Sequence, residues 1–211
     1  MNIKCFPMSC NCYVVSDDDG NCVVFDPCDR AEAIYEYIKN EKMELCAIII
    51  THAHFDHISA LNELVMCANQ DEKDIPVYIN AHDAAAMYNS EKNLSKPLFG
   101  SPYVYTGILK TVLDGFSVNV GKMSFLAISA PGHTEGSTCY VCHGARTVFS
   151  GDVLFEGSIG RTDFPGGDMT KMRNSLKRIM SIMGNYTVYP GHGPSTTLNE
   201  ERNNNPYIAG L

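Results

Sequence analysis

Residues 51–57 read Thr-His-Ala-His-Phe-Asp-His, which places three histidines and one aspartate within six positions. Imidazole is the commonest nitrogen ligand of protein-bound zinc, and a carboxylate completes sites that keep one position open for water. The apolar residues 45–50 just before this segment predict a buried strand. The histidines would then emerge at the carboxyl end of a strand, where open α/β sheets commonly place ligands. The segment therefore predicts a catalytic metal site.

Three further candidate ligands, His133, Asp152 and His192, each end a predicted strand and each adjoin a glycine. Glycine lets the backbone turn sharply and approach closely, as a loop that presents a ligand must do. Seven ligands are enough for two metal ions, and a shared aspartate with a bridging hydroxide would hold the ions roughly 3.5–4 Å apart. The seven candidates are His52, His54, Asp56, His57, His133, Asp152 and His192.

The other two histidines, His82 and His143, are not expected to be ligands. The first opens a short predicted helix and the second lies in a predicted hairpin turn. A single histidine is more often a packed or surface residue than a metal ligand.

The candidate ligands must be positioned by a succession of strands and helices, which the hydrophobic periodicity predicts. Strands are expected at 11–16, 22–26, 45–50, 76–80, 115–120, 122–130 and 186–189, with two more that run through residues 142 and 150. Helices are expected at 30–40, after the histidine turn, at 81–87, at 169–183 with Asp168 as N-cap, and after a capping box that begins at Thr197. Residues 71–74 are expected to be a polar connection. Two β-rich halves, each followed by helices, predict two mixed β-sheets flanked by helices, in a single domain over residues 1–211.

Residues 89–106 show little periodicity and carry three aromatic residues, Phe99, Tyr103 and Tyr105. Long loops of this kind in compact domains are often lids or substrate-contact loops. The alternative is a surface excursion whose aromatic side chains pack against the body of the protein. The sequence leaves both interpretations open.

The composition limits the possible partners. The formal net charge is -8 over 211 residues, and the phosphate contacts of nucleic-acid binding require clustered Lys and Arg that the chain lacks. No apolar run approaches a membrane span, and residues 1–7 lack a secretory hydrophobic region, so a cytoplasmic protein is expected.

Nine cysteines without a signal peptide indicate reduced thiols rather than a disulfide framework. Cys10 and Cys12 are interpreted as small apolar residues, and Cys139 and Cys142 should face opposite sides of one strand.

The pattern H-x-H-x-D-H, followed by single His, Asp and His residues at strand ends, resembles the metallo-β-lactamase superfamily over residues 11–206. The resemblance implies an αββα sandwich with a two-metal site at one edge. Matched residue by residue, it implies that His52, His54 and His133 hold the first ion. Asp56, His57 and His192 would hold the second ion, and Asp152 would bridge the two.

Residues 11–13, 157–168 and 189–197 resemble the short, glyoxalase II-like (hydroxyacylglutathione hydrolase-like) members of that superfamily. The resemblance implies a dinuclear thioester hydrolase that acts on S-D-lactoylglutathione or a related small thioester through a metal-bridging hydroxide, which Asp56 would help to orient. Two divalent ions are implied, with zinc favoured over iron or manganese. Arg161 and Asp163 are candidates for substrate contact or support of the ligands, and an ordinary loop salt bridge is the alternative.

Departures from the family pattern limit the substrate prediction. Class B β-lactamases use a cysteine near the second metal where this chain has Asp152, which argues against antibiotic hydrolysis. The helical domain with which full hydroxyacylglutathione hydrolases bind glutathione has no counterpart after His192, so its residues cannot be carried over. The expected partner is a small-molecule thioester, with no nucleic acid and no membrane, and the protein is expected to be a monomer or homodimer.

Two alternatives remain. A persulfide dioxygenase, a mononuclear-iron branch of the same superfamily, has a signature that residues 161–164 resemble. The chain departs from that branch at Pro165, where glutamine is usual, and at Gly193-Pro194, which follow His192 here. The second alternative is a non-catalytic metal-binding or sensor module, which loss of a ligand would favour; no ligand is lost.

Overall fold

The computed structural model describes residues 1–69 and 74–211. Within these residues the first half of the chain forms a mixed six-stranded sheet. Its strands, in spatial order, are β1 (Asn2–Pro7), β2 (Asn11–Ser16), β3 (Asn21–Phe25), β4 (Glu44–Ile49), β5 (Val77–Asn80) and β6 (Leu109–Val112). The β1–β2–β3 meander is antiparallel, whereas β3 to β6 pair in parallel. The helices of this half are α1 (Ala31–Asn40), α2 (Phe55–Ile58), α3 (Leu61–Asn69), α4 (Ala84–Met87) and α5 (Ser95–Phe99).

The second half of the described chain forms another mixed six-stranded sheet. In spatial order its strands are β14 (Thr196–Thr197), β13 (Thr187–Pro190), β10 (Thr147–Gly151), β9 (Thr138–Cys142), β8 (Met123–Ser129) and β7 (Ser117–Val120). Its helices are α6 (Met169–Met180) and α7 (Leu198–Asn204), and a small hairpin joins β11 (Leu154–Phe155) to β12 (Ser158–Ile159). The two halves therefore repeat the same sheet-and-helix plan.

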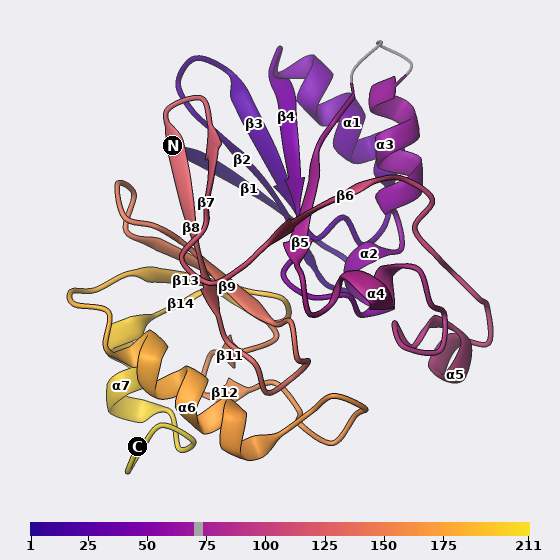
Figure 1. The fold of residues 1–211 in the computed structure, drawn as a ribbon. Coiled ribbons are helices and arrows are strands. Elements are labelled where there is room, and N and C mark those ends of the chain that lie inside the picture. The colour runs from indigo at the N-terminus through magenta and orange to yellow at the C-terminus, as the bar shows by residue number, and fades with distance from the viewer. Residues whose placement is uncertain (70–73) are drawn as a thin grey trace.

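Three apolar layers hold the two sheets and the helices together. Figure 1 shows α1 and α3 on one outer side of the molecule and α6 and α7 on the opposite side, with the sheets between them. Strand alternation explains the layers, because successive side chains of a strand point to opposite faces. In β2, Val15 faces the other sheet whereas Val14 packs on the side of α1 and α3. At the centre, the rings of Phe25 and Phe149 stack 4.1 Å apart between their centroids. The expected αββα arrangement of two mixed sheets flanked by helices is confirmed.

Most of the predicted elements are present with small shifts at their ends. Asp168 caps α6 as expected, since its side chain accepts hydrogen bonds from the backbone N–H of Thr170 and Lys171, but the helix ends at Met180 rather than 183. The Thr197 side chain accepts from the Glu200 N–H at the start of α7, as the capping box predicts. The polar connection expected at 71–74 lies outside the described residues except for its last one.

Several short elements were not predicted: β1, β6, β14, the β11–β12 hairpin and α5. Each is six residues or fewer. Strands this short carry too few alternations for periodicity to reveal them, and they exist because a neighbouring strand supplies their hydrogen bonds. Cys139 and Cys142 do face opposite sides of β9, one toward α6 and the other toward the first sheet. No helix in the described ranges combines the length and apolar character that a membrane crossing requires.

Candidate metal centre

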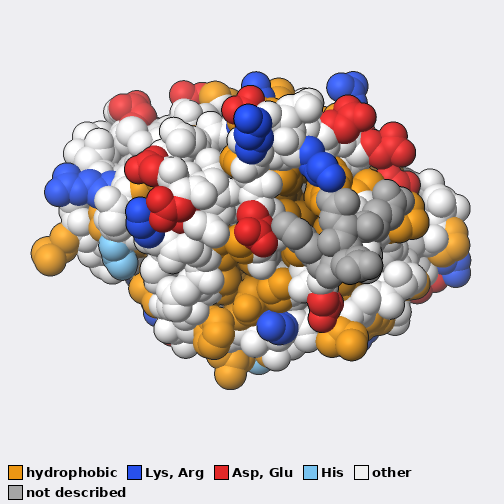
Figure 2. Space-filling model, turned by 90° about the horizontal axis from the view of Figure 1, so that it is seen from above, with side chains coloured by type: hydrophobic (Ala, Val, Ile, Leu, Met, Phe, Trp, Pro, Cys, Tyr) orange, Lys and Arg blue, Asp and Glu red, His pale blue; other side chains and the backbone are white. Residues whose placement is uncertain are grey.

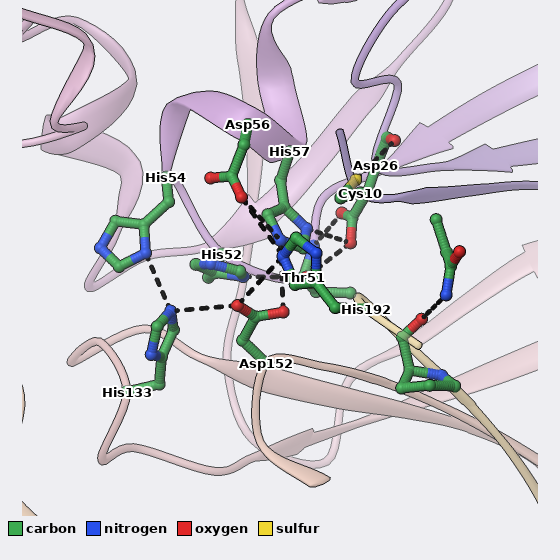
Figure 3. A network of polar contacts seen from close by, with 12 residues as sticks. Cys10, Asp26, Thr51, His52, His54, Asp56, His57, His133, Asp152 and His192 are labelled. Carbon is green, nitrogen blue, oxygen red and sulfur yellow. Dashed lines mark hydrogen bonds and ion pairs between the residues drawn. The ribbon is translucent and has the colours of Figure 1, made fainter. Parts of the chain in front are cut away.

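The seven candidate ligands converge at one edge of the sandwich, although they come from both halves of the chain (Figure 3). His52 and His54 lie in the connection that leaves β4, and Asp56 and His57 lie in the short helix α2 that follows. The remaining three lie directly after strands of the second sheet: His133 after β8, Asp152 after β10 and His192 after β13. The sequence-based expectation that strand ends meet at one place therefore agrees with the arrangement in space.

Distances divide the ligand atoms into three overlapping groups, each with its atoms within 4.8 Å of one another. The groups are His52, His54 and His133; Asp56, His57 and His192; and His52, His57 and Asp152. The first two groups are the sets that the family resemblance implies for the first and second ion. The third contains one histidine from each set together with Asp152, so this carboxylate lies between them.

The individual contacts of Asp152 also place its carboxylate between the first and second ligand groups. Its Oδ1 lies 3.3 Å from Nε2 of His57, and its Oδ2 lies 3.5 Å from Nε2 of both His133 and His192. His133 belongs to the first group and the other two histidines to the second. One carboxylate therefore reaches ligand atoms of both groups.

Polar atoms without partners at this position show that the residues fit a metal ion. Nε2 of His52, Nε2 of His57 and Oδ1 of Asp152 are buried, and none forms a hydrogen bond of normal geometry within the described chain, although the last two lie 3.3 Å apart. Buried polar groups are normally paired, because leaving one unsatisfied costs about 1–3 kcal/mol. Divalent cations bound in the cluster would give these atoms partners. The mixed nitrogen and oxygen donor set suits zinc, iron or manganese.

The histidines are oriented by partners on the side away from the cluster. Nδ1 of His57 donates to Oδ2 of Asp26 at 2.9 Å, and the Thr51 hydroxyl donates to the same oxygen at 2.7 Å. Nδ1 of His52 lies 3.1 Å from the Thr51 hydroxyl oxygen and donates to it. With Nδ1 engaged in this way, Nε2 of each imidazole faces the cluster. Such outer partners fix the tautomer and raise the basicity of a metal ligand.

His133 is oriented in the same way by backbone. Its Nδ1 donates to the Arg161 carbonyl oxygen at 2.8 Å, which turns Nε2 toward Nδ1 of His54, 2.9 Å away. Arg161 thus contributes to the site through its main chain. Its side chain forms a two-point ion pair with Asp163, at 2.7 Å for each contact, and lies over the Phe164 ring at 3.8 Å.

The loop that carries His192 is held by β2 of the first sheet. The Asn11 amide donates to the carbonyl oxygens of Pro190 and Gly193, and the Tyr13 hydroxyl donates to Pro190 as well. A side chain at Gly191 would collide with Asp152 and His57, so only glycine lets this loop come so close to the cluster. The first sheet therefore positions a ligand that the second sheet carries.

Burial and mutual repulsion keep two of the histidines neutral. Burial, followed by the neighbouring His57 and His133, holds the pKa of His52 well below the ordinary histidine value. Burial and His133 lower the pKa of His54 to about 3. Both imidazoles therefore present free lone pairs near neutral pH, as metal ligation requires.

The two histidines of the second ligand group, His57 and His192, instead have raised pKa values. Burial works against protonation of His57, but Asp152 and Asp26 outweigh it and raise its pKa well above the ordinary value. The hydrogen bond with Asp56 raises the pKa of His192. In the metal-free protein these two histidines hold protons that a cation would have to displace.

Both acidic candidates are ionised. Burial alone would raise the pKa of Asp56 and of Asp152, yet nearby histidines hold both below the usual aspartate value. His192 is the main influence on Asp56 and His57 on Asp152. In the metal-free protein these two carboxylates therefore lie beside protonated histidines whose protons a bound cation would replace.

A cleft of about 240 Å³ opens over the cluster, and five of the seven candidate ligands line it. One wall is apolar and comes from the 89–106 loop: Leu94, Leu98 and Phe99. Arg161 and Phe164 line the cleft as well. Tyr103 and Tyr105 of the same loop instead pack on the core of the first half. The packing interpretation therefore holds for Tyr103 and Tyr105, whereas Phe99 lies where a substrate-contact residue would be, and substrate contact stays a prediction.

Sequence reasoning did not identify the residues that orient the ligands. Asp26 and Thr51 sit just after β3 and β4, and the sequence marks Asp26 only as the end of a strand before a proline. Asp26 also adopts a left-handed backbone with φ of 47°, which aspartate tolerates better than most residues. His82 and His143 do not join any ligand group of the described chain; His143 instead contacts the Tyr186 hydroxyl at 2.8 Å.

The fold and the His/Asp cluster define a metallo-β-lactamase-fold protein with a site for divalent metal. The family model for the metallo-β-lactamase superfamily matches residues 5–192, and the chain belongs to this superfamily. It is therefore a member of a family of metallohydrolases.

Curated relatives match over nearly the whole chain. A probable metallo-hydrolase of Bacillus subtilis, YqgX, is 34% identical over 97% of this chain and 95% of its own length. The hydroxyacylglutathione hydrolase GloC of Haemophilus influenzae is 31% identical over 99% of this chain and 98% of its own length.

Solved structures are equally similar. BLEG-1, described as a B3 metallo-β-lactamase, is 36% identical with a TM-score of 0.90, over 99% of this chain and 100% of its own. TTHA1623, solved in a di-iron-bound form, is 32% identical with a TM-score of 0.83, over 98% of this chain and 100% of its own. ETHE1 of Myxococcus xanthus is 25% identical with a TM-score of 0.79, over 100% of this chain and 85% of its own.

Proposed function

We propose that the protein is a dinuclear metallohydrolase that cleaves small thioesters, S-D-lactoylglutathione or a related compound, as its similarity to GloC suggests. The observation that carries the proposal is the position of Asp152, whose two carboxylate oxygens reach histidines of both ligand groups. In this assignment His52, His54 and His133 hold one ion, Asp56, His57 and His192 hold the other, and Asp152 is shared. Zinc is the favoured metal, with iron or manganese as alternatives, and the di-iron form of TTHA1623 makes iron a serious one.

The chemistry follows from the residues that face the cleft. Two divalent ions, when bound, would make water a nucleophile near neutral pH and polarise a carbonyl oxygen. Asp56 is ionised and about 29% exposed, so its carboxylate can accept a hydrogen bond from the attacking water and orient it. The apolar wall of Leu98 and Phe99 gives the acyl group a surface on which to pack. Arg161 at the same cleft offers a charged contact for a polar thiol carrier.

The proposed class of partner agrees with the formal net charge of -8 and with the one face of the molecule that Figure 2 draws. The face drawn in Figure 2 carries acidic and basic side chains scattered among uncharged ones rather than a gathered basic patch. We therefore propose a small-molecule substrate rather than a nucleic acid. Cys10, Cys12, Cys28, Cys139 and Cys142 are buried free thiols, which fits a reducing compartment such as the cytoplasm.

A panel of substrates on metal-analysed protein tests the proposal. It contains lactoylglutathione, coenzyme A thioesters, a β-lactam and glutathione persulfide with an oxygen electrode. Hydrolysis of one or more thioesters with two ions per chain supports the proposal. Cleavage of the β-lactam alone would instead assign the activity that is described for BLEG-1.

A mononuclear-iron persulfide dioxygenase is the second candidate. It is favoured by the first ligand group, whose three histidines could hold a single ion by themselves, and by the position of Arg161 and Phe164 at the cleft. One iron per chain with rapid oxygen consumption would identify this activity. If the metal-loaded protein turns over no compound in the panel, a non-catalytic metal-binding module is the supported alternative.

A further inference from the structure

Asp83 is a buried carboxylate beside the metal centre that belongs to none of the ligand groups. It lies between β5 and α4 and is 5% exposed. Its Oδ2 accepts hydrogen bonds from the Ala53 N–H at 3.0 Å and the Thr134 hydroxyl at 2.8 Å, and its Oδ1 accepts from the Gly136 N–H at 2.8 Å. Three donors therefore converge on one side chain.

These donors come from the two loops that carry the first ligand group. Ala53 lies between His52 and His54 in the loop after β4, which belongs to the first sheet. Thr134 follows His133 in the loop after β8, which belongs to the second sheet. A single carboxylate thus joins the segments that must bring three histidines from opposite halves of the protein to one point.

The packing around Asp83 leaves little room for adjustment. A side chain at Gly136 would approach Asp83 to 2.5 Å. Thr134 is fixed further, because its hydroxyl also lies 2.8 Å from the Ser137 hydroxyl. Burial raises the pKa of Asp83, whereas the hydrogen bonds from Thr134, Ala53 and Gly136 oppose that shift. The side chain is held rigidly, as a residue that sets a spacing must be.

We propose that Asp83 is a positioning residue that sets the separation between the His52–His54 turn and His133, and thereby the affinity of this ligand group for its divalent ion. The inference rests on the metal centre of the proposed function. It does not depend on which substrate is cleaved. Replacing Asp83 with asparagine leaves one oxygen acceptor and turns an amide N–H₂ toward at least one donor, so the link between the loops loosens.

Asp17 provides a matched control in the same protein. It is 6% exposed and accepts hydrogen bonds from the Asn21 N–H at 3.0 Å and the Lys122 N–H at 2.9 Å. It therefore also joins a turn of the first sheet to a turn of the second. Asp17 follows the last residue of β2, whereas Asn11, which holds the His192 loop, is the first residue of that strand. The hydrogen-bond partners of Asp17 adjoin no candidate ligand.

The test compares zinc binding by metal-free wild type, Asp83→Asn and Asp17→Asn, in competition with a chromophoric chelator, and thermal unfolding of the three metal-free proteins. Asp83→Asn should weaken the binding of one zinc ion by roughly 10–100-fold, as loss of an outer partner of a metal ligand does. Asp17→Asn should lower the unfolding temperature to a similar degree and leave zinc affinity at the wild-type value. Equal zinc affinities for the two variants would overturn the proposal.

If Asp83→Asn does not fold, Thr134→Val removes only one of the three contacts. This variant should weaken the binding of the same zinc ion by a smaller factor. Zinc affinity at the wild-type value would again overturn the proposal. Because the readout is zinc affinity, it separates this inference from the proposed reaction. Two zinc ions bound as expected, with no thioester cleaved, would reject the reaction and leave the role of Asp83 supported. A wild type that binds no zinc, iron or manganese would reject both.

Discussion

The Asp26 carboxylate lies 2.9 Å from Nδ1 of His57, on the face of the imidazole that points away from the ligand cluster (Figure 3). The same carboxylate accepts hydrogen bonds from the Thr51 backbone N–H at 2.8 Å and from its hydroxyl. One residue at the end of β3 therefore orients a histidine of the second ligand group directly and, through Thr51, His52 of the first. The two candidate ion sites therefore share the support of Asp26, and both lie beside the Asp152 carboxylate.

Replacing Asp26 with asparagine should therefore weaken both sites. The amide cannot accept hydrogen bonds at both of its terminal atoms, so either the Thr51 N–H or the His57 and Thr51 side chains lose their acceptor. Loss of such a partner typically lowers metal affinity by about 10–100-fold. Chelator competition on the metal-free variant measures this; a change confined to thermal stability would show that Asp26 serves folding alone.

Replacing Asp152 with alanine should have a larger effect because, in the proposed assignment, it removes a ligand of both ions. The number of ions bound per chain should fall below the wild-type number, and thioester turnover should drop by more than the roughly 100-fold expected for an outer partner. Metal analysis after exhaustive dialysis is the measurement. Unchanged metal stoichiometry would refute the bridging assignment.

Metal binding should depend on pH. In the metal-free protein the pKa values of His57 and His192 are raised above the ordinary histidine value of about 6.5. Both side chains therefore stay protonated to a higher pH than an ordinary histidine. Those protons must leave when a cation binds, and zinc affinity should therefore rise as the pH increases from about 6 to about 8. His52 and His54 should add nothing to this dependence, since their pKa values are lowered and they are already neutral.

Calorimetric titration in buffers of different ionisation enthalpy counts the protons released on zinc binding. Proton release that falls as the pH rises is expected. Affinity that stays constant over this range, with no proton release, would contradict the charge states assigned to His57 and His192.

Replacing Arg161 with alanine should lower kcat/KM more than it lowers the free energy of unfolding. Its ion pair with Asp163 is exposed, and exposed ion pairs add little to the free energy of folding. Because Arg161 lines the cleft and its guanidinium lies over the ring of Phe164, another lining residue, Arg161→Ala should lower kcat/KM for a thioester with an anionic thiol carrier by roughly tenfold, equivalent to about 1.4 kcal/mol of binding. The backbone carbonyl that holds His133 is retained in this variant, so metal content should not change.

Arg178→Ala is the matched control. Arg178 also forms an exposed two-point ion pair, with Asp114, and it does not line the cleft over the candidate ligands. Its kcat/KM should stay at the wild-type value. Equal losses in the two variants would show that the cleft position of Arg161 is unimportant.

The sequence predicts the ligands and their convergence because both depend on local patterns. H-x-H-x-D-H is contiguous, and His133, Asp152 and His192 each follow an apolar strand and adjoin a glycine. The supporting residues are different. Asp26, Asp83 and Asn11 are single polar residues whose partners are 25 to 182 positions away, so no local spacing reveals their role. Short strands such as β6 are similarly hidden, because only pairing with β5 makes them strands.

Titration of the metal-free protein with zinc, iron or manganese while lactoylglutathione and coenzyme A thioester hydrolysis is followed tests the central claim most directly. Activity toward a thioester should reach its maximum at two ions per chain, because in the proposed assignment each ligand group holds one ion and Asp152 contacts both groups. A maximum at one iron per chain, with oxygen consumed on glutathione persulfide and no thioester cleaved, would contradict the account.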